Sequence, residues 1–172
     1  MANPDPPGWS RHRGSRAIQR IIEYAPATGG LALWIRHQDI EQGPGATPIA
    51  TDGTTIFYAP AFARLPLPEQ IGLVAHEVLH VALRHPQRLL DLQRQLGDLD
   101  RHLFNVCADA IVNSTLSHLG WLRLAPAAVY LDQLLGLTLN LSEPVDKALL
   151  EWDVERLYRA VDDRRPPRAA RL

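Results

Sequence analysis

The stretch Leu73–Pro86, LVAHEVLHVALRHP, decides how the rest of the sequence is interpreted. It carries two histidines, His76 and His80, with Glu77 beside the first, inside an otherwise apolar run. On a helical wheel His80 lies about 40° and Glu77 about 100° from His76, and apolar residues fill most of the remaining circumference. A helix that is apolar nearly all round is normally buried. The pattern therefore predicts a core helix with one narrow polar stripe.

Two imidazoles and a carboxylate in a buried helix need polar partners, because leaving them unpaired costs several kcal/mol. Histidines one helical turn apart present two ring nitrogens on one face, which suits a tetrahedral zinc ion. Glu77 projects to the side, where it can take a proton from a metal-activated water that attacks a carbonyl. The motif predicts Zn²⁺ bound by His76 and His80, with Glu77 as the general base. The alternative is a core helix that carries the pattern by chance.

The motif supplies only two of the three protein ligands of a catalytic zinc site. The long metzincin spacing is excluded, because its third histidine would fall at Pro86. If the helix continued to position 85, His85 would lie on the face opposite His76, and opposite faces cannot share a metal. His85 is therefore predicted to be a surface or loop histidine.

A second predicted helix, residues 101–119, carries another polar stripe, made of His102, Asn105, Asp109 and Asn113. If the two buried helices face each other with their polar stripes, the polar side chains of both stripes can bind one metal ion between them. Asp109 lies at the centre of the second stripe and can bind as an anion, so it is the predicted third ligand, with His102 as the alternative.

The remaining members of this stripe have predicted supporting roles. Asn105 and Asn113 would orient ligands or water, and His102 could instead stabilise the oxyanion of the transition state. His118 lies on the opposite face and is expected to be exposed. Without a metal, Asp109 would belong to a polar network and pair with an arginine such as Arg84 or Arg101.

The composition is that of an ordinary globular protein. The chain has 172 residues, 46% hydrophobic and 22% charged, with a formal net charge of −1, which favours one domain and gives no sign of a nucleic-acid partner. Its single cysteine, Cys107, excludes an intrachain disulfide. No apolar run has the length of a signal peptide core or a membrane span. The expectation is a cytoplasmic protein without a membrane segment.

Patterning along the chain predicts a small sheet among helices, with a flexible N-terminal arm at 1–14, one domain at 15–161 and a disordered or linker tail at 162–172. Asp52-Gly53 joins two β-rich runs, as in a type I′ hairpin. The other predicted elements are helices at 15–24, 68–84 and 154–161, the last with Asp153 as N-cap, and a strand at 31–37. We expect a single α+β domain in which the sheet packs on the two long helices.

Four segments together resemble the bacterial zinc metallopeptidase domain that occurs N-terminal to von Willebrand factor A-like domains. The segments, in chain order, are ATDGTTIFYAPAF, LPLPEQIGLVAHEVLHVALRH, NVCADAIVN and EWDVERLYRAV. The similarity covers roughly residues 31–161. Arg84 stands where the family often has glycine, and Phe104 and Cys107 stand where it usually has tryptophan and alanine.

The resemblance implies a zincin-like fold, zinc on His76 and His80, Glu77 as base, and Asp109 as part of the site. It also implies a protein or peptide substrate and a partner of the von Willebrand A-like or AAA+ ATPase type. A zinc-stabilised protein-interaction module with weak or lost catalysis is the alternative function. By analogy with zincins, residues 54–58 are predicted to bind an extended peptide by strand addition. Candidate donors to the oxyanion are Tyr58, Tyr130 and Tyr158.

Overall fold

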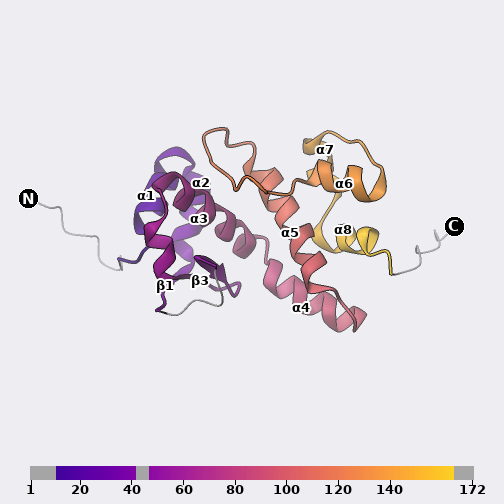
Figure 1. Ribbon diagram of the computed structural model, residues 1–172, viewed down its shortest axis with the longest axis horizontal. Coiled ribbons are helices and arrows are strands. Elements are labelled where there is room, and N and C mark those ends of the chain that lie inside the picture. The colour runs from indigo at the N-terminus through magenta and orange to yellow at the C-terminus, as the bar shows by residue number, and fades with distance from the viewer. Residues whose placement is uncertain (1–10, 42–46, 165–172) are drawn as a thin grey trace, which may run out of the picture. The chain divides into compact units, whose positions relative to one another are not determined.

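A computed structural model describes residues 11–41 and 47–164 (Figure 1). The chain divides between Val78 and Leu79 into two compact units, and each is described here by itself. The described residues form eight α-helices, one 3₁₀-helix and a three-stranded sheet, so the predicted α+β class is confirmed. None of the helices in these ranges combines the length and the apolar character of a membrane span.

The first unit begins with two helices, α1 (Ser15–Tyr24) and α2 (Pro26–Trp34). α1 agrees with the prediction, but the strand predicted at residues 31–37 is wrong for Leu31–Trp34, which lie in α2. Pro26 occupies the first turn of α2, where its missing N–H costs no hydrogen bond. A Cβ at Gly29 would lie 2.6 Å from the backbone Cα of Ile22 in α1. Gly29 therefore permits close packing of α2 on α1.

The sheet contains β1 (Arg36–Asp39), β2 (Ile49–Thr51) and β3 (Thr55–Tyr58), in the order β1-β3-β2 (Figure 1 labels β1 and β3). β2 and β3 form the predicted antiparallel hairpin, and β1 pairs with β3 in parallel. β3 is thus the central strand, with both edges hydrogen-bonded. The prediction that residues 54–58 bind a peptide by strand addition is therefore wrong, because strand addition needs an open edge.

The hairpin turn is not of type I′, which needs a positive φ at both central residues. Gly53 has a φ of 97°, but Asp52 is not among the described residues with a positive φ. The side chain of Asp52 holds the turn instead. Its Oδ1 accepts hydrogen bonds from the backbone N–H groups of Thr54 and Thr55, each at 2.8 Å. These bonds stabilise the carboxylate and lower the pKa of Asp52.

The last residues of the predicted N-terminal arm are fixed to the sheet. The backbone N–H of Arg13 donates to Asp39 Oδ1 at 2.9 Å, and its guanidinium donates to the carbonyls of Ile40 and Tyr58, each at 3.0 Å. The ring of Tyr58 also packs against Gly14, where a Cβ would lie 2.3 Å from it. The ordered chain thus starts before α1; residues 1–10 and 165–172 of the predicted arm and tail lie outside the described residues.

A short 3₁₀-helix, η1 (Pro60–Arg64), leads into α3 (Leu67–Ala82), which carries the histidine motif. The buried side chain of Gln70 donates through Nε2 to the carbonyl of Phe62 at 3.0 Å and to that of Leu65 at 3.1 Å. These bonds fix the entry to α3. The helix begins in the first unit, and its last turn belongs to the second.

α3 ends at Ala82, and Arg84 takes a left-handed conformation with a φ of 57°. The chain then enters α4 (His85–Leu96), with Pro86 in its first turn. A left-handed residue at a helix end is most often glycine, because a Cβ is strained there. A glycine at position 84 would adopt this conformation without that strain.

We expect the free energy of unfolding of Arg84→Gly to be about 0.5–1 kcal/mol higher than that of Arg84→Ala. Glycine removes the strain of the left-handed backbone, and the larger conformational entropy of glycine in the unfolded chain offsets part of this stabilisation. Both variants lose the arginine side chain, so their difference reports the backbone alone. Chemical denaturation measures it. At the exposed position Asp91 within α4, the same pair should show the opposite order. Equal stability of the two variants at position 84 would contradict the assignment of strain.

The second unit is helical, with α4 followed by α5 (Arg101–Leu116), α6 (Leu131–Leu139), α7 (Val145–Glu151) and α8 (Val154–Val161). The predictions for α5 and α8 hold, apart from α5 ending at Leu116, and the side chains of Asp100 and Asp153 cap their first turns. α4, α6 and α7 were not predicted. The largest fully buried side chains of this unit's core are Leu92, Phe104, Leu131, Leu135, Leu157 and Tyr158.

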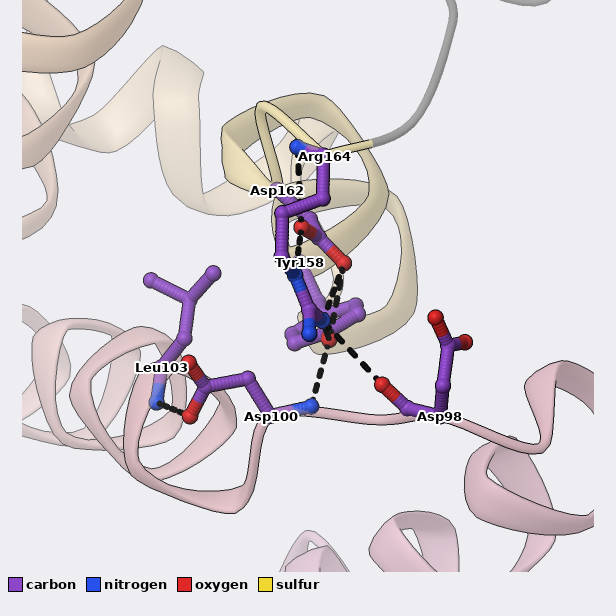
Figure 2. A network of polar contacts seen from close by, with 6 residues as sticks. All are labelled: Asp98, Asp100, Leu103, Tyr158, Asp162 and Arg164. Carbon is purple, nitrogen blue, oxygen red and sulfur yellow. Dashed lines mark hydrogen bonds and ion pairs between the residues drawn. The ribbon is translucent and has the colours of Figure 1, made fainter.

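A polar network ties α8 to the start of α5, as Figure 2 shows. The buried hydroxyl of Tyr158 accepts from the backbone N–H of Asp100 at 2.8 Å and donates to Asp162 Oδ2 at 2.9 Å. Arg164 binds both carboxylate oxygens of Asp162 and donates to the carbonyl of Asp98 at 3.1 Å. The ordered structure therefore extends past α8 into the first residues of the predicted tail.

Candidate metal centre

The last turns of α3 and the middle of α5 bring three predicted ligands together. One ligand atom each of His76, His80 and Asp109 lies within 4.8 Å of the others. His80 Nε2 lies 3.0 Å from Asp109 Oδ1. His76 precedes His80 by one turn of the same continuous helix, so helix geometry places both rings on one face. All three side chains are half-buried.

This donor set fits a tetrahedral metal. Two imidazole nitrogens and a carboxylate oxygen are common protein ligands of zinc, with metal–ligand bonds of about 2.0–2.2 Å. Bonds of that length at tetrahedral angles separate the ligand atoms by roughly 3.3 Å. The observed pair at 3.0 Å is close to that separation, and side-chain rotation can close the longest gap. The three residues thus form a possible metal site, and a tetrahedral ion bound by them would take a fourth ligand.

Glu77 follows His76 on α3 and is half-buried. Burial is the largest cause that raises the pKa of the Tyr58 hydroxyl, followed by the negative charges of Asp39 and Glu77. Tyr58 is fully buried, with its hydroxyl 2.9 Å from His37 Nδ1. His37 Nε2 lies 2.7 Å from the carbonyl of Ala32, which can only accept, so Nδ1 accepts the Tyr58 proton. The oxyanion-donor candidate Tyr58 thus donates to a protein group.

The histidine beside this hydroxyl belongs to a stacked pair that the sequence did not suggest. The rings of His12 and His37 are parallel, with centroids 4.5 Å apart. Burial, and then the charge of His37, lower the pKa of His12 to about 4. Burial also lowers the pKa of His37. Both rings are therefore neutral near pH 7 and serve as flat packing surfaces beside Tyr58.

The prediction for His85 is wrong. His85 is only 3% exposed, and its Nδ1 lies 2.9 Å from Nδ1 of His80. The helical wheel misplaced it because α3 ends at Ala82, and the left-handed turn at Arg84 redirects the chain. Pro86 correctly indicated that the first helix ends near residue 84, but helical periodicity cannot give the direction of a side chain that begins the next helix.

The other members of the second stripe take different places. His102 and Asn105 have exposed side chains on α5, and His102 is not part of the ligand group found among the described residues. Asn113 is buried and donates through Nδ2 to the carbonyl of Val129 at 3.0 Å, which ties α5 to the segment before α6. Arg101 donates to Gln93 Oε1 at 2.9 Å.

Two further predictions concern residues outside the stripe. His118 is exposed, as predicted, and its Nε2 lies 2.6 Å from Asp146 Oδ1, which raises the pKa of His118. The donor candidate Tyr158 is fully buried in the network of Figure 2. Its hydroxyl proton is directed to Asp162.

The sequence was compared with models of known protein families. Residues 10–171 match the family described as "Putative metallopeptidase domain". The chain belongs to this family. Nearly the whole sequence of this metallopeptidase-domain protein is covered, including all three residues of the possible metal site. No curated protein and no solved structure matches it.

Proposed function

We propose that the chain is a zinc-dependent metallopeptidase domain of zincin-like fold that hydrolyses peptide bonds in protein substrates. The observation that carries this proposal is the group of His76, His80 and Asp109, with ligand atoms within 4.8 Å, directly beside Glu77 on α3. Membership of the metallopeptidase-domain family supports the same reaction class.

Each side chain has a distinct role in this proposal. His76, His80 and Asp109 would hold the metal, which when bound would acidify a water molecule and polarise the peptide carbonyl. Glu77 would accept the proton of the attacking water and pass it to the leaving amine. Glu77 follows His76 on α3, so the proton acceptor lies next to the ligand group.

Zinc is the proposed ion because two imidazoles and one carboxylate leave one tetrahedral position open, as in catalytic zinc sites. The substrate is proposed to be a protein or peptide. A von Willebrand A-like or AAA+ ATPase partner remains a prediction from the resemblance.

We expect the purified protein to contain one zinc ion per chain and to cleave members of an unstructured peptide mixture, with cleavage lost on chelation and restored by added Zn²⁺. Elemental analysis and mass spectrometry of the products measure both effects. Circular dichroism before and after chelation controls for unfolding. Zinc at full stoichiometry without metal-dependent cleavage of any peptide would contradict the peptidase and favour a zinc-stabilised interaction module.

A further inference from the structure

The ring of His80 is held on two sides. Its Nε2 lies 3.0 Å from Asp109 Oδ1, and its Nδ1 lies 2.9 Å from Nδ1 of His85. The rings of His80 and His85 meet edge to face, with centroids 5.1 Å apart. His85 is almost completely buried, so water does not compete freely for this contact.

The direction of the hydrogen bond follows from the chemistry of the two rings. Two imidazole nitrogens at this distance share one proton, so one donates and the other accepts. A metal on Nε2 of His80 requires the ring proton on Nδ1. Nδ1 of His80 then donates, Nδ1 of His85 accepts, and His85 carries its own proton on Nε2.

The backbone of His85 is fixed independently of α3. His85 is the first residue of α4, beyond the left-handed turn at Arg84. Farther along α4, Arg88 makes a two-point ion pair with Glu155 of α8, its Nε donating to Oε1 at 2.7 Å. Leu92 is buried in the core of the second unit. The hydrogen-bond acceptor for His80 therefore lies on α4, and contacts with α8 and with the core of the second unit hold α4 in place.

We propose that His85 is a positioning residue for His80: it accepts the Nδ1–H hydrogen bond and so holds the unprotonated Nε2 toward the position where a metal would be shared with His76 and Asp109. The metal part of this inference rests on the proposed function. Ligand histidines usually donate their second ring N–H to a fixed acceptor, and loss of such an acceptor lowers metal affinity by about 10–100-fold. His85 supplies that acceptor from a second imidazole.

The test compares His85→Phe, which keeps a ring but no acceptor, with His85→Asn, whose side-chain oxygen lies near the position of Nδ1. Zn²⁺ affinity is measured by competition with a chromophoric chelator. We expect His85→Phe to bind about 10–100-fold more weakly than wild type and His85→Asn to recover most of the loss. His118→Phe, at an exposed histidine, is the matched control and should bind like wild type.

Wild-type affinity in His85→Phe would overturn the proposal, and so would equal weakening in both variants, since that result indicates packing alone. Should the variants not fold, the ¹⁵N resonances of zinc-loaded wild type decide: a protonated, hydrogen-bonded Nδ1 of His80 supports the proposal, and an unprotonated Nδ1 overturns it. Peptide cleavage is not part of these readouts. Zinc binding without cleavage therefore contradicts the peptidase and leaves the role of His85 standing.

Discussion

Replacement of Glu77 by glutamine is expected to lower kcat/KM for peptide cleavage by about 10²–10⁴-fold with no change in metal content. Glutamine keeps the size and the hydrogen-bonding reach of the side chain but cannot accept a proton from water. The three ligand residues are untouched, so the metal should stay. Cleavage rates and elemental analysis of the same preparation measure the two effects separately.

The matched control is Glu69→Gln, since Glu69 lies on the same helix but is exposed in its first turn. It should leave both cleavage and zinc content at wild-type values. Cleavage by Glu77→Gln at the wild-type rate would remove Glu77 as general base. Loss of zinc together with activity would instead show that Glu77 holds the metal.

Asp109→Ala is expected to weaken zinc binding by at least about 10²-fold. Structural zinc sites contribute roughly 10–16 kcal/mol in total, so one protein ligand accounts for several kcal/mol. Removing the carboxylate also leaves His80 Nε2 without the oxygen that lies 3.0 Å from it. Chelator competition measures the affinity, and thermal unfolding of the metal-free protein checks that the fold persists.

An exposed aspartate serves as the control for Asp109. Asp146→Ala removes a carboxylate that contacts His118 at the surface, and zinc affinity should not change. Unchanged affinity in Asp109→Ala would exclude Asp109 as the third ligand.

The helices that could be predicted from sequence are those whose stop and start signals are local. Asp153 and Asp100 cap α8 and α5 with their own side chains, and the periodicity of each helix agrees with its cap. α2 was missed because Leu31–Trp34 is a short apolar run, and such a run fits a strand as well as a helix. The packing of Gly29 on Ile22 of α1 is a tertiary contact, which the local sequence does not show.

In and around the candidate site, too, positions within one helix could be predicted from the sequence, whereas contacts between distant segments could not. Helical spacing within α3 was enough to place His76, Glu77 and His80 on neighbouring faces. The pairing of β3 with β1 joins residues far apart in sequence, so its central position could not be read from the hairpin alone. His85 was misplaced because helical periodicity holds only inside one helix, and a single left-handed residue ended it.

The Tyr158 network sets a lower limit on any shortened form of this protein. Tyr158 holds the backbone of Asp100, the N-cap of α5, and α5 carries Asp109 two turns farther on. A fragment that stops before Tyr158 would lose the bond to Asp100, and one that stops before Asp162 would lose the ion pair between this buried carboxylate and Arg164. The smallest fragment suited to expression or crystallisation therefore has to extend through Arg164, although the histidine motif lies far upstream.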